Sequence, residues 1–109
     1  MAKSKLTSEM LELVAERFKL LSEPVRLELL NHLRNGEMTV SELVDESGLA
    51  QANVSKHLRL LHAAGFVTRR KEGLFVYYAL ADRGVFQLCD IMCERLESET
   101  RVRRRILAS

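Results

Sequence analysis

The side chains with the clearest chemical potential lie along residues 51–64. Drawn as a helix, this segment places Val54, Leu58 and Leu61 on one side and small, polar or basic groups on the other. Small groups let a helix enter the major groove of duplex DNA, which is about 12 Å wide, and asparagine and arginine can pair with base edges there. Which of these groups would hold bases and which phosphates stays open. The expected DNA contacts in this segment are Gln51, Asn53, Ser55, Lys56, His57 and Arg59.

A second group of bases, Arg69, Arg70 and Lys71, stands just before Gly73. At the tip of a hairpin these side chains would reach a neighbouring DNA backbone or the minor groove, although each could also be a solvated surface charge. The formal net charge is only +2, so the argument depends on where the charges lie. A third basic run, Arg101–Arg105, fits either a solvated tail, a balance for the negative end of a helix, or a contact with flanking DNA.

Cys89 and Cys93 are spaced four residues apart and predict two thiols on one helical face. Their Cβ atoms would be about 5–6 Å apart, too far for a disulfide without distortion. Three roles stay open for them. They could pack as small apolar side chains in a dimer interface, bind a thiophilic metal or metalloid ion, or sense oxidants or sulfur species. No cofactor is required, and none of the three histidines is expected to be a metal ligand.

Four helices must position the basic segment. Apolar spacing predicts a helix over residues 8–21, and Pro24 begins a second that stops at Gly36. Thr39 and Glu42 form a capping-box pattern for a third helix that ends at Gly48. The fourth runs from about Gln51 to Ala64 behind a weak cap at Ala50.

The period changes after Gly65. Residues 66–71 and 74–80 predict a β-hairpin around Glu72-Gly73, with Val76, Tyr78 and Leu80 on one face. Asp82 caps a last helix over about 84–107, which is too long for so small a domain unless a partner covers it. The prediction is one mainly α domain with a small hairpin over residues 1–109, a winged helix-turn-helix in the order ααααββα.

Three stretches resemble the ArsR/SmtB family of metal-responsive repressors: FKLLSEPVRLELLNHL, VSKHLRLLHAAGFV and RRKEGLFVYYAL. The family's recognition signature stands here as Ser55, His57, Leu58 and Leu61, and its wing signature as Gly73 with Tyr78. The resemblance covers about residues 8–107. It implies a homodimer built from the first and last helices and a repressor that binds a palindromic operator and is released by a ligand.

The sequence departs from the family's two best-known metal sites. The predicted helix over Ser41–Ser47 has no thiol, and no histidine follows His62. Neither a Cys-x-Cys site there nor an Asp/His and His/Glu site on the last helix can form. Zinc, nickel or cobalt sensing through those sites is therefore not expected, which leaves Cys89 and Cys93 as the candidate ligands.

Several other classes of protein fit the sequence poorly. A phosphate-cradling glycine loop, a nucleophile elbow and a plausible acid/base pair are all missing, so we do not expect an enzyme. No membrane span or signal-peptide core is visible, and a cytoplasmic location with reduced thiols is expected. Two alternatives stay open: a winged-helix regulator without a ligand, and a protein-docking module, although the exposed face of residues 51–64 lacks aromatic anchors.

Overall fold

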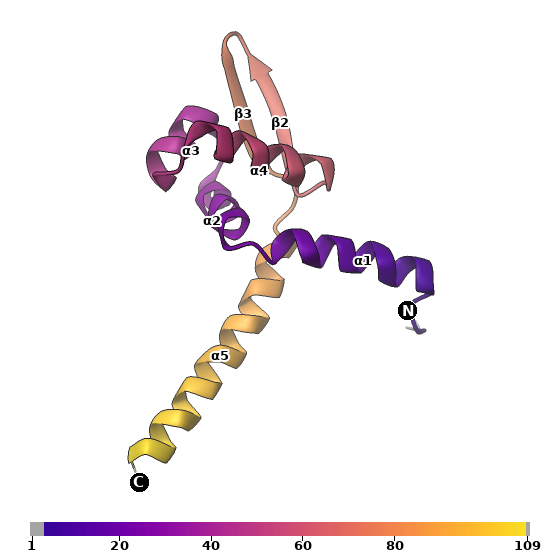
Figure 1. Cartoon of the computed structure of the whole chain (residues 1–109), viewed down its shortest axis with the longest axis vertical. Coiled ribbons are helices and arrows are strands. Elements are labelled where there is room, and N and C mark those ends of the chain that lie inside the picture. Colours follow the sequence, from indigo (N-terminus) through magenta and orange to yellow (C-terminus); the bar gives the residue numbers. More distant parts are fainter. Residues whose placement is uncertain (1–3, 109) are drawn as a thin grey trace.

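The computed structural model describes residues 4–108 as five α-helices, one 3₁₀ turn and three short strands (Figure 1). The elements along the chain are α1 (Ser8–Leu21), α2 (Pro24–His32), η1 (Leu33–Asn35), β1 (Met38–Thr39), α3 (Val40–Ser47), α4 (Gln51–Ala63), β2 (Val67–Glu72), β3 (Phe75–Leu80) and α5 (Gly84–Ala108). The winged helix-turn-helix prediction is confirmed. The helices begin and end within a residue or two of the expected positions, except that α2 ends at His32 and the 3₁₀ turn η1 continues the chain to Gly36.

The sheet has one more strand than the sequence predicted. β1, β3 and β2 pair antiparallel in that order, and the two-residue strand β1 lies along β3 with Met38 opposite Tyr78. The hairpin turn is also displaced by one residue, because Glu72 still pairs with Phe75 and the two-residue loop is Gly73-Leu74. Gly73 has φ 60°, a conformation that glycine adopts without strain.

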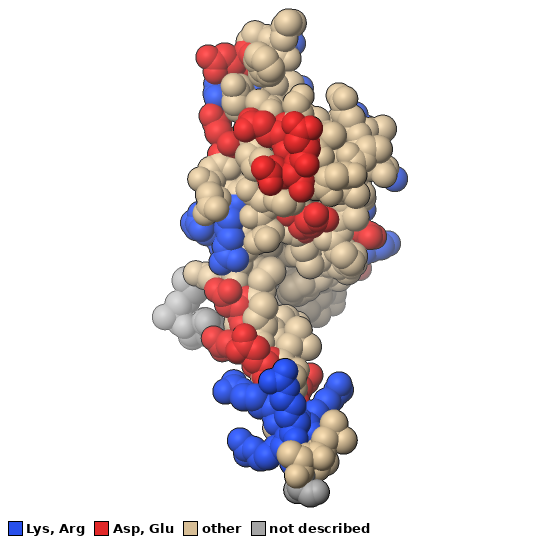
Figure 2. Space-filling model, turned by 90° about the vertical axis from the view of Figure 1, so that its left-hand side faces the viewer, with Lys and Arg blue, Asp and Glu red and all other residues tan. Residues whose placement is uncertain are grey.

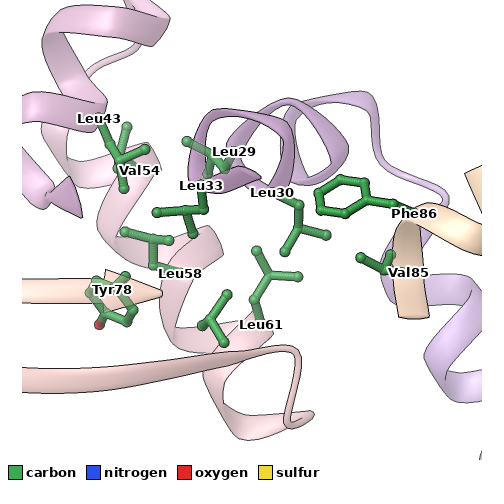
Figure 3. Packing of buried hydrophobic residues seen from close by; sticks show 11 residues of the cluster. Leu29, Leu30, Leu33, Leu43, Val54, Leu58, Leu61, Tyr78, Val85 and Phe86 are labelled. Carbon is green, nitrogen blue, oxygen red and sulfur yellow. The ribbon is translucent and has the colours of Figure 1, made fainter. Parts of the chain in front are cut away.

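The hydrophobic core lies between α2, α4 and the base of the sheet. Leu29, Leu30 and Leu33 of α2 and η1 are at most 1% exposed, and they meet Leu58 and Leu61 of α4 (Figure 3). Burial of a leucine side chain stabilises a fold by about 1.5–3 kcal/mol. The buried stripe expected for residues 51–64 is therefore confirmed. The other core members are Leu43, Val54, Val67, Tyr78, Val85 and Phe86.

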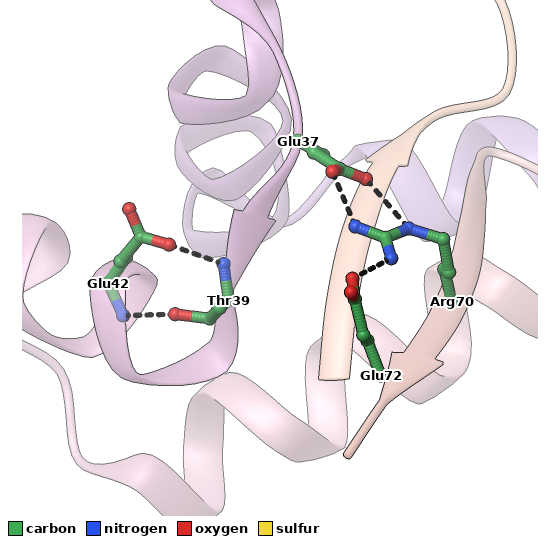
Figure 4. A network of polar contacts seen from close by, with 5 residues as sticks. All are labelled: Glu37, Thr39, Glu42, Arg70 and Glu72. Carbon is green, nitrogen blue, oxygen red and sulfur yellow. Dashed lines mark hydrogen bonds and ion pairs between the residues drawn. The ribbon is translucent and has the colours of Figure 1, made fainter. Parts of the chain in front are cut away.

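Local caps fix the helix-turn-helix. The Thr39 hydroxyl accepts a hydrogen bond from the Glu42 amide, and the Glu42 carboxylate accepts one from the Thr39 amide (Figure 4). This capping box starts α3, and Gly48 ends it with φ 71°, in the left-handed region. Ala50 precedes α4 and provides no side-chain cap. The tight connection that results holds α4 across α3, as a helix-turn-helix requires.

Helices α1 and α5 extend away from this body (Figure 1). None of the residues of α1 is buried, and α5 contributes only Val85 and Phe86 to the core. Both helices expose large apolar side chains, and the ones on α5 recur along most of its length. The exposed set on these helices includes Met10, Leu11, Leu13, Phe18, Leu88, Ile91, Met92, Leu96, Val102, Ile106 and Leu107.

Within residues 4–108, even the 25-residue helix α5 lacks the uniformly apolar character needed to cross a membrane.

Candidate nucleic-acid interface

The outward face of α4 carries most of the predicted contact residues. Gln51, Asn53, Lys56 and Arg59 are exposed, while Ser55 is half-buried. The inward face carries Val54, Leu58 and Leu61, each fully buried, so the helix cannot rotate without losing its core contacts. The fold therefore presents the polar side of α4 to solvent as a rigid surface.

A hollow lies between α4 and the hairpin. On α4 its polar lining comes from Ser55, Arg59 and His62, which are spaced four and three residues apart and share one face of the helix. The facing strands contribute Arg69 and Tyr78. Val40 and Val76 complete the lining. Arg59 and Arg69 thus approach the same space from different elements. Among residues 4–108, neither guanidinium has an ion-pair partner.

His62 was not among the predicted contact residues. It lines this hollow beside Arg59 and Arg69, and it is exposed. The spacing of Ser55, Arg59 and His62 at four and three residues could have indicated this shared stripe. The sequence predicted Tyr78 to lie in the hairpin. It lines the same hollow because the strand register places it opposite Arg69.

The hairpin separates its three basic residues onto two faces. Arg69 pairs with Tyr78 and Lys71 with Val76, so these two side chains lie on the face that turns toward α4. Arg70 pairs with Tyr77 on the opposite face.

Arg70 is engaged by neighbouring acids. Its guanidinium donates to Glu37, at 2.7 Å between Nη2 and Oε1, and to Glu72 (Figure 4). It also lies 4.4 Å above the Tyr77 ring centroid. These two carboxylates raise the pKa of Arg70 above its usual range. Arg70 therefore lies on the opposite face of the hairpin from Arg69, and two carboxylates already balance its charge.

His57 is half-buried and turned toward α2. The Arg26 Nε donates to the His57 Nδ1 across 3.1 Å, and the Arg26 Nη1 donates to the carbonyl of Leu20 at 3.1 Å. Burial lowers the pKa of His57, and the nearby cations Arg26 and Lys56 lower it further, against an opposing effect of Glu23. Because Nδ1 accepts this hydrogen bond, the ring in this arrangement is neutral and carries its proton on Nε2.

Cys89 and Cys93 both border an apolar hollow between α1, α2 and α5. Cys89 is half-buried and Cys93 is exposed, and Phe18, Leu27 and Met92 are among the side chains around them. Thiolates suit soft ions, so the donor type fits a thiophilic metal. One chain provides only two such ligands here, and residues 4–108 contain no cluster of three or more potential ligands.

Charge is unevenly distributed over the surface. Figure 2 shows acidic side chains gathered on the α3 side of the body and arginines gathered at the far end of α5. The acids on α3 include the exposed Glu42, Asp45 and Glu46. A polyanion would be repelled by this side, so the α4 surface is the electrostatically favourable approach.

Residues 23–69 match the model of a bacterial regulatory protein family, the arsR family. An uncharacterized HTH-type transcriptional regulator of Methanocaldococcus jannaschii is 38% identical over 87 residues, which are 79% of this chain and 98% of that protein. A probable mercury resistance operon repressor of Streptomyces lividans is 38% identical over 74 residues, 68% of this chain, and the chain spans 59% of its length.

A solved structure gives the same fold. It is the homodimeric winged helix-turn-helix DNA-binding domain of a possible ArsR-family transcriptional regulator from Mycobacterium bovis. Its TM-score is 0.73 at 28% identity, and the match covers 89% of this chain and 90% of that one.

Proposed function

Because the chain belongs to the arsR family and is a DNA-binding transcriptional regulator rather than an enzyme, we propose that it is a homodimeric repressor of a palindromic operator. Such a protein acts on the chromosome, so we place it in the cytoplasm. The observation that carries the proposal is the surface formed by α4 and the hairpin, where cations that have no acidic partner within residues 4–108 converge.

The α4–hairpin hollow suits a backbone phosphate. Arg59 and Arg69 line it from two elements, and neither has an ion-pair partner among residues 4–108. A phosphate placed between them would gain charge-assisted hydrogen bonds and would release condensed counterions from the DNA. Phosphate contacts of this kind fix the register of a protein on the duplex.

In this arrangement the first turns of α4 contact the base edges. Gln51 and Asn53 are exposed there, and an amide side chain can pair in two places with an adenine edge in the major groove. Lys56 and Lys71 extend the phosphate contacts on either side. His57 and Arg70 were also predicted to contact DNA, and we now propose structural roles for both, because each is already held by other residues.

The apolar faces of α1 and α5 support the homodimer. They expose side chains such as Phe18, Ile91, Met92 and Leu96, which a second copy of the chain would cover. Two-fold symmetry would place the two α4 helices in successive major grooves, about 34 Å apart. The M. bovis neighbour of the same fold is homodimeric, which supports a dimer.

Selection of duplexes from a random library, followed by fluorescence anisotropy, tests the proposal. We expect the selected sites to contain two inverted half-sites about one helical turn apart, bound more weakly as salt rises. Selection without any inverted repeat, or binding that is indifferent to salt, would contradict it. Binding to a protein partner in place of DNA would favour the docking-module alternative.

We also propose that Cys89 and Cys93 receive the signal that releases the repressor. Both thiols border the hollow where α5 meets α1 and α2, so a bound soft ion or an oxidised thiol would change the packing of the helices assigned to the dimer. The S. lividans relative is a probable mercury resistance operon repressor, which supports a soft-metal signal.

Addition of arsenite, Cd(II) or a mild oxidant to the reduced complex tests this role. We expect one of the three to release the DNA from the native protein and to have no effect on the Cys89→Ser/Cys93→Ser variant. The alanine variant Ser98→Ala on the same helix serves as a control for substitution alone. DNA binding that withstands all three reagents would leave the cysteines as packing residues and the regulator without this signal.

A further inference from the structure

Arg26 makes two contacts that join three helices. It lies on α2 and is half-buried, its Nη1 bonds the Leu20 carbonyl near the end of α1, and its Nε bonds the His57 ring on α4. We call this set of two hydrogen bonds the Arg26 bridge. It connects a helix assigned to the dimer interface with the helix assigned to DNA reading.

We infer that the Arg26 bridge positions α4 for operator binding, and that protonation of His57 breaks it and weakens the binding. The inference rests on the proposed function. It makes Arg26 and His57 positioning residues, which act on DNA through the placement of α4.

The geometry explains why the guanidinium of Arg26 contacts both α1 and α4. The Leu20 carbonyl lies near the end of α1, where backbone carbonyls lack helical partners, so a guanidinium is a suitable cap for it. The same planar group then presents its Nε toward α4 at a fixed angle. A change in the angle of α1 is thereby passed to the middle of α4.

The chemistry of the ring makes the bridge sensitive to protons. A neutral imidazole accepts at Nδ1, but a protonated ring has donors at both nitrogens and would face the Arg26 cation directly. The charged groups near His57 are Arg26 on α2, Glu23 at the start of α2, and Lys56 on α4. Two of these three are cations, so the protonated ring would be repelled from its present position.

The pH profile of operator binding tests the inference in the full-length chain. Between about pH 8 and about pH 5, we expect operator affinity to fall about tenfold as the charge-assisted hydrogen bond is lost. The His57→Asn variant replaces Nδ1 with an amide oxygen at the same distance from Cβ, and it cannot be protonated in this range. We expect it to bind normally at the higher pH and to show no such fall.

His32→Asn is the matched control, because His32 is also half-buried but does not line the proposed phosphate site. This variant should keep the fall in affinity that His57 causes. Identical pH profiles for the native protein and His57→Asn would overturn the inference and leave the proposed function standing. Absence of any operator binding by the native protein would instead count against the proposed function.

Substitutions of Arg26 separate the bridge from simple charge. Arg26→Lys keeps the cation but cannot reproduce the planar fork, so we expect it to bind operator about tenfold more weakly, like Arg26→Gln. Adding His57→Ala, which has no acceptor, to Arg26→Gln should cause no further loss, since each change removes the same hydrogen bond. Additive losses would show that the two residues act separately.

Hydrogen exchange of the protein without DNA tests whether Arg26 links α1 to α4. In Arg26→Gln we expect amide protection to fall together in the last turn of α1 and in α4, while α3 keeps its protection. A decrease confined to one of the two helices would show that Arg26 does not link them.

Discussion

Arg69 and Arg70 are neighbours in the chain with opposite surroundings. Arg69 lines the hollow beside Arg59, whereas Arg70 is held by Glu37 and Glu72 on the other face of the hairpin. A residue's charge therefore says little about DNA binding until its strand face and its partners are known. The pair provides a matched comparison, because the two substitutions remove the same charge from adjacent positions.

Arg69→Ala should weaken operator binding and lower the slope of log affinity against log salt by about 1.8, because each of the two chains of the dimer loses one phosphate contact worth about 0.9. Arg70→Ala is the control and should leave that slope nearly unchanged, because its charge is already balanced. Anisotropy titrations at several salt concentrations measure both slopes. Equal reductions in the two variants would contradict the separation of the hairpin into two faces.

At the scale of elements, α4 begins less favourably than α3. Thr39 and Glu42 cap α3 on both sides of its first turn, but Ala50 leaves the first amides of α4 without a side-chain acceptor. A small side chain at this point also leaves room for DNA to approach the start of the helix. In the proposed complex with DNA, stability and access would therefore compete at position 50.

Ala50→Ser should raise the free energy of unfolding by about 0.5–1 kcal/mol, because its hydroxyl can accept from an amide in the first turn of α4. Thr39→Ala, which removes the existing cap of α3, should lower it by about 1 kcal/mol. Urea unfolding at one fixed protein concentration measures both changes. A loss of stability in Ala50→Ser would show that the backbone at this position cannot accept the cap.

The elements were largely predictable because their signals are local. Thr39 with Glu42, Gly48, and Asp82 two residues before Gly84 each act over a few positions, and the structure bears them out. Strand β1 was missed because two residues carry no periodicity. The bonds from Arg26 to His57 and from Arg70 to Glu37 span 31 and 33 residues, so no spacing rule could indicate them.

At the scale of the whole molecule, the helices outside the core decide how the chain assembles. Leu88, Ile91, Met92 and Leu96 form an exposed apolar face on α5, and the apolar hollow beside the cysteines continues it toward α1. Burying a charge in an interface on this face would remove its hydration, which is costly without a paired group.

Leu88→Glu should therefore yield monomers and abolish operator binding, while the isolated domain body keeps its core. Gln87→Glu adds the same charge to an exposed neighbouring position and should remain dimeric. Light scattering after gel filtration gives the mass of each variant, and circular dichroism shows whether it is folded. A dimeric Leu88→Glu protein would place the interface elsewhere.

The unburied faces of α1 and α5 also make the number of chains in the cell a regulatory variable. Below the dissociation constant of the dimer, the concentration of pairs grows with the square of the concentration of chains. Occupancy of a two-fold site then rises steeply over a narrow interval of expression. Dilution of the protein by growth would then lower operator occupancy more steeply than it lowers the concentration of chains.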